Sequence, residues 1–113
     1  MTFKFCKLVV AHLLVISVLA DEPSPPQKLR SEIVEHHTNY TTVNVTWKPK
    51  LNDSRADYYC YQLIESLTQL LILISNTSHT AVELSIPHDI NTSFVISAHN
   101  CAGRSLQSAI LLN

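Results

Sequence analysis

Glycine is almost absent from this chain, and Gly103 is the only one among 113 residues. A loop that cradles phosphate needs several glycines, because backbone N–H groups reach the phosphate only where side chains stay out of the way. The Gly-x-Ser-x-Gly turn of many hydrolases is missing as well. Both routes to catalysis are therefore excluded, and a small secreted enzyme is the most remote of the functions considered.

Positive charge is not in excess either. Lysine and arginine together number 8, against 9 aspartates and glutamates, which gives a net charge of -1. Proteins bind nucleic acids and anionic membranes through basic patches. We therefore expect neither of these as a partner.

The cysteine and histidine spacings of zinc sites are missing too. The adjacent pair His36 and His37 would point to opposite faces of a strand, which makes a poor chelate. We interpret the other scattered histidines, His79, His88 and His99, as surface or loop residues. No metal site and no cofactor are expected.

No apolar run is long enough to span a membrane, which takes about 20 residues. The longest, residues 8–19, contains a histidine and a serine, follows two lysines and leads into Ala20. A charged start, a short apolar stretch and a small-residue cleavage site are typical of a secretory signal. We expect residues 1–20 to be a signal peptide, with an uncleaved anchor as the alternative, and residues 21–113 to form one domain. Loss of the two lysines would take the net charge to about -3.

Five Asn-x-Ser/Thr triplets, the acceptor pattern for N-glycosylation, follow residue 20. Their asparagines are Asn39, Asn44, Asn52, Asn76 and Asn91. The alternative explanation is that these residue types are simply abundant on β-rich surfaces. Together with the signal, five triplets predict a secreted glycoprotein with at least two sites occupied.

Apolar and polar residues alternate along most of the remaining chain, which is typical of half-buried strands. Strands are expected at residues 29–34, 42–47, 56–65, 69–75, 82–86, 94–99 and 105–112. The candidate core residues are Val43, Val45, Trp47, Tyr59, Tyr61, Leu84, Phe94 and Ile96. No stretch beyond the signal shows a convincing helical period. The pattern predicts an all-β, seven-stranded immunoglobulin-like sandwich.

Four motifs follow one another along the expected mature chain. They are a Pro-rich start before Leu29, Val43-x-Val45-x-Trp47-x-Pro49, Tyr59-x-Tyr61-x-Leu63, and Phe94-x-Ile96-x-Ala98-x-Asn100-x-x-Gly103-x-Ser105-x-x-Ser108. In this order and spacing they resemble a fibronectin type III domain. One position departs from the family, because Thr92 stands where a tyrosine usually forms a corner. The resemblance implies a recognition or spacer unit.

The resemblance also implies where the cysteines lie, since Cys6 would leave with the signal and two remain. The family's third and sixth strands are antiparallel neighbours, and Cys60 and Cys101 both fall at outward-facing positions. Two cysteines in an oxidising compartment usually pair. We expect a cross-strand Cys60–Cys101 disulfide, with two free thiols or an intermolecular link as the alternatives.

One segment breaks the alternation, because residues 70–74 are apolar at every position. In the implied fold this strand would lie at or near a sheet edge, leaving two or three large side chains exposed. Such a surface is typical of a contact site or of an edge open to an added strand, and burial by local packing or by a glycan at Asn76 is the alternative. We predict a binding surface on the outer face around Leu71 and Leu73, plus Arg104 in the loop before the last strand.

These patterns predict a secreted module for extracellular binding or adhesion that acts by protein–protein contact. The expected partner is an extracellular protein, and no membrane insertion is expected after signal cleavage. The Arg-Gly-Asp triplet of integrin-binding family members is missing. The alternative is a truncated or soluble receptor-like ectodomain, which a longer transcript running past Asn113 into a membrane span would favour.

Overall fold

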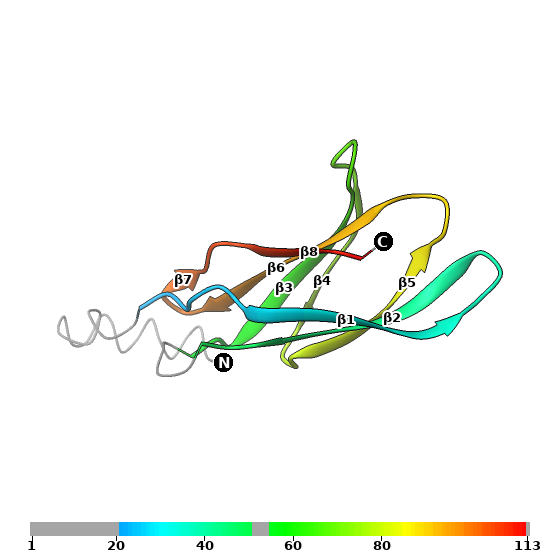
Figure 1. The fold of residues 1–113 in the computed structure, drawn as a ribbon. Helices are drawn as coiled ribbons and strands as arrows, with labels where there is room; N and C mark the ends of the chain where they lie inside the picture. The colour runs from blue at the N-terminus through cyan, green and yellow to red at the C-terminus, as the bar shows by residue number, and fades with distance from the viewer. Residues whose placement is uncertain (1–20, 51–54, 113) are drawn as a thin grey trace.

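The computed structural model describes residues 21–50 and 55–112. The regular structure in these ranges is β-strand, and two antiparallel sheets pack face to face (Figure 1). The all-β sandwich expected from the alternation of apolar residues is therefore confirmed. Within the described ranges, no helix is long and apolar enough to cross a membrane. The predicted signal peptide lies outside the described residues.

The first sheet contains β1 (Gln27–His36), β2 (Tyr40–Lys48) and β5 (Ala81–Pro87), in the order β1-β2-β5. The central strand β2 ends just before Pro49, which has no N–H to offer a ladder. Two irregularities interrupt the pairing of β1 with β2. Lys28 lies in the first of them and takes a positive φ of 54°.

The second sheet contains β4 (Leu71–Thr77), β3 (Tyr58–Glu65) and β6 (Thr92–Asn100), in the order β4-β3-β6. Two short strands, β7 (Gly103–Arg104) and β8 (Ser108–Leu111), both pair with β6. The strand expected at the apolar run is thus present, and it lies at the edge of this sheet.

The last expected strand, residues 105–112, is divided and begins earlier than predicted, which makes eight described strands instead of seven. Ser105 causes the division. Its backbone N–H donates to the Ala98 carbonyl at 2.8 Å, and its Oγ accepts the Ala98 N–H at 2.9 Å. Because a side-chain oxygen takes the place of a backbone carbonyl there, the ladder is interrupted until Ser108.

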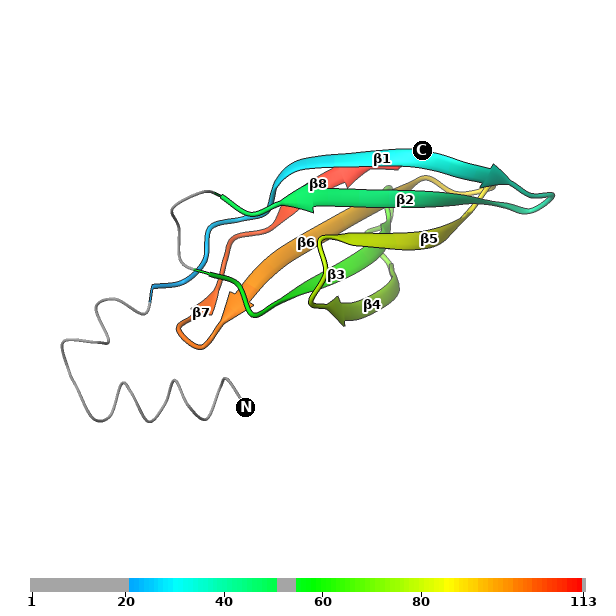
Figure 2. The same cartoon turned by 90° about the horizontal axis from the view of Figure 1, so that it is seen from below.

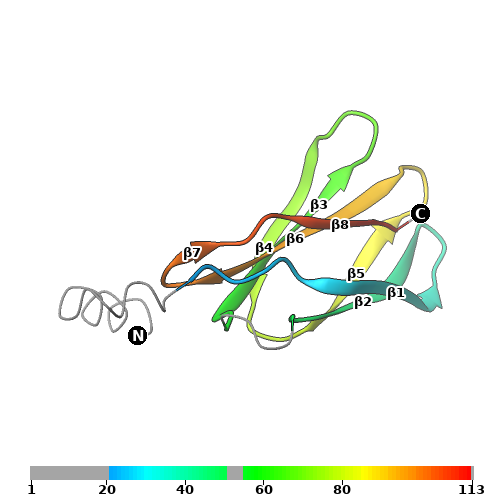
Figure 3. The same cartoon turned by 60° about the vertical axis from the view of Figure 1, so that its left-hand side comes forward.

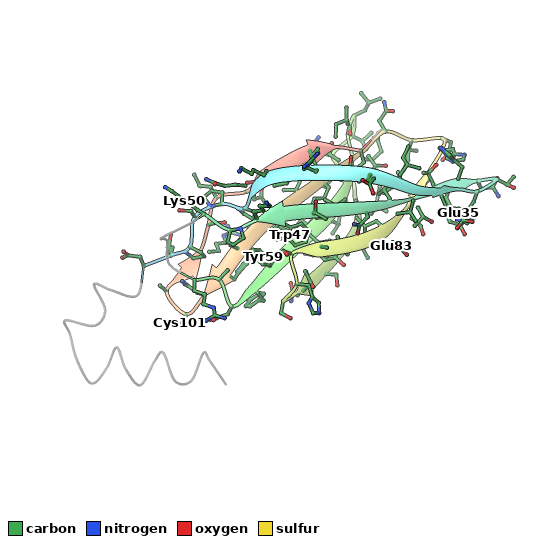
Figure 4. All side chains as sticks on the ribbon, turned by 60° about the horizontal axis from the view of Figure 1, so that its bottom comes forward. Glu35, Trp47, Lys50, Tyr59, Glu83 and Cys101 are labelled. Atoms are coloured by element: carbon green, nitrogen blue, oxygen red, sulfur yellow. The ribbon has the colours of Figure 1, made fainter. Side chains whose placement is uncertain are left out.

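The core lies between the two sheets, and all eight predicted core residues are buried, each with 7% or less of its surface exposed. Trp47 is at its centre (Figure 4). Its ring meets Tyr59 edge-on at a centroid distance of 5.5 Å and lies 5.8 Å from Phe94. These aromatic contacts join a strand of one sheet to two strands of the other. Thr92, where the family's corner tyrosine is missing, is fully buried.

The hairpin of β3 and β4 projects beyond the rest of the sandwich, as Figures 1 and 3 both show. At the opposite side, β1 and β8 run alongside each other (Figure 2). The two sides of the molecule are therefore built differently, with one closed by neighbouring strands and the other open.

Candidate binding surface

Strand β4 is the outermost strand of its sheet. It pairs with β3 on one side, and no other strand of the described residues pairs with it. Residues 70–74, named here the apolar edge, each expose between 40% and 66% of their surface. The structure thus exposes five large apolar side chains where the sequence predicted two or three. Glu65 and Glu83 are the nearest residues with a formal charge along the chain.

The predicted pair Leu71 and Leu73 lies on opposite faces of the sheet, which corrects the expectation that both face outward. Leu73 is opposite Leu63 and shares its core-side face, whereas Leu71 is opposite Ile64, which faces outward. A bulge in β4 produces this change of face. Leu73 nevertheless stays exposed, although Leu63 beside it is buried, because Leu73 belongs to the outermost strand of the sheet.

The turn that leads into the apolar edge is held by its own side chains. The Glu65 carboxylate accepts hydrogen bonds from the Thr68 hydroxyl at 2.7 Å, the Thr68 N–H at 2.8 Å and the Leu67 N–H at 3.2 Å. These bonds, the Thr68 hydroxyl first, lower the pKa of Glu65. Gln69 takes a positive φ of 63°, a conformation that usually falls to glycine. The edge therefore starts from an ordered turn.

Arg104 is exposed, as expected, but it lies far from the apolar edge. It is opposite His99 at the β6–β7 end of the sheet, whereas Leu71 aligns with Ser93 through Ile64. Six residues of β6 separate these two positions, roughly 20 Å at about 3.3 Å per residue. The structure thus divides the predicted surface into two separate places.

The turn before Arg104 depends on the single glycine. Gly103 has a φ of 147°, and a Cβ added there would lie 2.7 Å from a side-chain oxygen of Glu22. The Asn100 Oδ1 accepts the N–H groups of Ala102 and Gly103 at 2.8 and 3.2 Å. Glycine is therefore favoured here by its positive φ, whereas the flexible Glu22 side chain could move to make room for a Cβ.

A second cluster on the outer face was not predicted. The rings of Tyr58 and His99 stack at 4.8 Å, and the Ser97 hydroxyl lies 2.9 Å from His99 Nε2. Burial, followed by the nearby positive charge of Arg104, lowers the pKa of His99. The sequence carried a signal for this cluster, since Ser97 and His99 alternate with the core residues of β6.

Leu111 also lies on the outer face and was not predicted as part of the surface. It is opposite Ser93, in the same row as Ile64 and Leu71. Its neighbour Ile110 packs against the core, so alternation requires Leu111 to point outward. Leu111 therefore lies in the same outer-face row as Leu71 and Ile64, but the polar Ser93 stands between Ile64 and Leu111 in that row.

The expected Cys60–Cys101 disulfide is wrong in this structure, where Cys60 is a free thiol. Cys60 lies opposite Ser97, and Cys101 is four residues farther on, in the β6–β7 turn (Figure 4). That offset is roughly 13 Å along the strand. A disulfide needs Cα atoms about 4.4–6.8 Å apart. Cys60 lies on the outer face as expected, but the strand register prevents the pairing.

Three of the predicted glycosylation sites, Asn39, Asn76 and Asn91, have exposed side chains. Asn44 is half-buried within β2, and Asn52 lies outside the described residues. Asn76 belongs to β4 itself, opposite Cys60 on the outer face. Glycosylation stays a prediction at all five sites.

The histidines near one end of the first sheet interact with each other through a threonine. The Thr41 hydroxyl lies 2.7 Å from His88 Nε2 and 3.4 Å from His36 Nδ1. These side chains border a shallow hollow that also contains Ile33, Val43 and Ile86. Among the described residues, no group of three or more potential metal ligands gathers in one place.

No protein-family model matches this sequence. No curated protein matches it either. Solved structures do resemble the fold. The structure of an FN3tt mutant aligns with 80% of this chain and 94% of its own, with a TM-score of 0.62 and 20% identity.

Two further solved structures have the same arrangement of strands. The fourth FNIII domain of a human protein covers 82% of this chain and 79% of its own, with a TM-score of 0.68 and 16% identity. A set of consecutive domains from titin covers 81% of this chain and 32% of its own, with a TM-score of 0.61 and 17% identity. At such identities the likeness establishes architecture alone, and it shows that this chain has the fibronectin type III fold.

Proposed function

We propose that this chain is a secreted extracellular module for binding or adhesion, which acts by protein–protein contact through the apolar edge and catalyses no reaction. One observation carries the proposal. Five consecutive large apolar side chains lie exposed at residues 70–74, and four of them belong to β4, whose second side has no described partner. Exposed apolar surface of this extent on a small domain is typical of an interaction site.

The way the edge is built supports the same conclusion. A strand at a sheet edge can take up a further strand through its backbone, and that addition is a common mode of protein recognition. The turn at Glu65 and Thr68 orders the approach to the edge before any partner arrives. A partner therefore meets a preformed strand and has less conformational entropy to remove.

Secretion belongs to the proposal because of the charged start, the short apolar stretch and the small residue at Ala20. The acceptor triplets at Asn39, Asn76 and Asn91 have the exposed side chains that such a role requires. N-terminal sequencing of material from the culture medium is expected to begin at Asp21. Enzymatic deglycosylation is expected to increase its gel mobility. A start at Met1, or an unchanged mobility, would refute the corresponding part.

Binding can be tested with the glycosylated, secreted chain displayed against a panel of recombinant extracellular domains. Wild type is expected to bind at least one domain of the panel. The variant Leu71→Lys is expected to bind it at least tenfold more weakly, because a lysine would place a charge in the middle of the apolar contact.

The matched control for this experiment is Leu106→Lys. Leu106 is even more exposed than Leu71 and lies outside the strands. This variant is expected to bind as wild type does. Equal binding by all three proteins would show that the apolar edge is not the binding site.

A further inference from the structure

The apolar edge lacks the devices that normally keep sheet edges from pairing with one another. Natural edge strands are guarded by charged side chains, by proline or by covering segments. Between Glu65 and Glu83 the chain contains no aspartate, glutamate, lysine, arginine or proline. Among the described strands, only β3 pairs with β4, so the other side of β4 has no paired strand. Two such edges can therefore approach without charge repulsion.

The sequence of the edge makes it complementary to itself. A strand added to β4 must present apolar side chains to both faces of the sheet, because residues on both faces of β4 are exposed. Most strands alternate and offer only one apolar face. Residues 70–74 are apolar at every position, so a second copy meets this requirement on both faces.

The other edge strands of the same molecule are less suitable for addition to β4, because they do not present apolar side chains on both faces. On β1, the charged residues Arg30 and Glu32 stand next to Ser31, and on β5 the exposed Glu83 and Ser85 alternate with buried residues. Antiparallel addition of β4 to β4 follows a two-fold axis and closes on itself, so it stops at two copies.

We propose that two copies of this chain associate through their β4 strands, which pair antiparallel and join the two second sheets into one continuous sheet. This inference rests on the proposed function, because it names the partner of the same edge. The contact is short, a few residues of backbone with the side chains on either face. Interfaces below about 1,200 Å² are usually weak. We expect dissociation on the order of micromolar concentrations.

Sedimentation equilibrium of the full secreted chain over a range of concentrations tests the proposal. Wild type is expected to pass from monomer to dimer as concentration rises. Leu71→Lys and Ile72→Lys are expected to weaken the dimer at least tenfold, whereas Leu106→Lys leaves it unchanged. Circular dichroism and thermal unfolding show whether each variant is folded. A wild type that stays monomeric, or forms open-ended aggregates, would overturn the proposal.

Hydrogen exchange distinguishes strand pairing from contact between side chains alone. In the dimer, backbone amides within residues 71–74 are expected to gain protection relative to a dilute sample, while the amides of β1 do not. A dimer that forms without this protection, or that forms equally well with Leu71→Lys, would overturn the proposal. Loss of the dimer with retained, Leu71-dependent binding to another extracellular domain would contradict self-association and leave the proposed function standing. Loss of both would contradict both.

Discussion

The two most exposed strands, β1 and β4, expose similar apolar side chains in different settings. On β1, Ile33 and Val34 are as exposed as residues of the apolar edge. They stand among charged neighbours, which are Lys28, Arg30, Glu32 and Glu35. The strand carries two irregularities and has β8 alongside it. On β4 there is one bulge, no charge and no covering strand.

Exposure is therefore similar on the two strands, and protection is what differs between them. Charge and covering strands keep β1 from pairing with another chain, although its apolar content is similar. β4 would be a liability in a protein that had no use for it. Its lack of protection is therefore the feature on which the proposed function rests, and four predictions test the comparison.

The largest effect on stability is expected from a substitution in the core that lies between the two sheets, on which both β1 and β4 depend. Phe94 is fully buried, lies between Leu63 and Ile110, and contacts the rings of Trp47 and Tyr61. Phe94→Ala is expected to lower the free energy of unfolding by about 3–5 kcal/mol. Leu71→Ala is expected to change it by less than about 0.5 kcal/mol, because the side chain is exposed. Urea denaturation measures both, and similar losses would contradict the placement of Leu71 at the surface.

The next effect is expected when the charges of β1 are removed. The double variant Glu32→Leu, Glu35→Leu is expected to aggregate at lower concentration than wild type, because it removes two of the four charged side chains that protect β1. Light scattering against concentration measures the onset. The control, Asp21→Leu with Asp89→Leu, removes the same charge outside the strands. If the control aggregates equally, net charge and not the strand would be responsible.

A smaller effect is expected from pH at the opposite end of the sheet from the apolar edge. The pKa of His99 is lowered in the folded protein, so the unfolded chain takes up a proton first, near the ordinary value of 6.5. Stability is therefore full above pH 6.5 and falls as pH decreases toward the lowered value. Denaturation midpoints at pH 7.5 and 5.5 measure the loss. His99→Phe keeps a ring against Tyr58 and is expected to reduce the loss of stability between pH 7.5 and 5.5. His79→Phe is expected to leave that loss unchanged.

The smallest effect is expected in the turn before the apolar edge. The pKa of Glu65 is lowered, so the contribution of its carboxylate is present above the ordinary value of 4.5 and is lost as pH falls through the lowered value. Glu65→Gln removes the charge at neutral pH and is expected to speed hydrogen exchange at the Thr68 amide. Glu83→Gln serves as the control on another strand. Unchanged exchange at Thr68 would show that the turn is held by other contacts.

The sequence was sufficient for the faces of the regularly alternating strands, such as β2 and β3, and insufficient for the register between strands. Alternation alone placed Val43, Val45 and Trp47 in the core, because a strand has only two faces. It also placed Cys60 on the outer face. It could not show that Cys60 pairs with Ser97, since that register is set by contacts between residues far apart in the chain.

The same limit applies to the predicted surface. The apolar run alone is typical of a strand buried on both faces, and its exposure was predicted only because the implied fold puts this strand at or near a sheet edge, where one face meets water. No pattern in the nearby sequence predicts the bulge that turns Leu71 away from Leu73, and none predicts the distance from these residues to Arg104. Both arise from how β4, β3 and β6 align as a set.

The free thiol of Cys60 is an intrinsic chemical probe for the opening of the outermost strand, β4. Cys60 is half-buried on β3, directly opposite Asn76 of β4. A thiol reagent reaches this half-buried sulfur slowly in the folded protein and gains full access when β4 separates from β3, so the rate of modification rises with the frequency of that separation. Contacts that hold β4 in place, including those made by a second copy bound along it, would lower the rate at which the Cys60 thiol is modified. No label has to be introduced for this measurement.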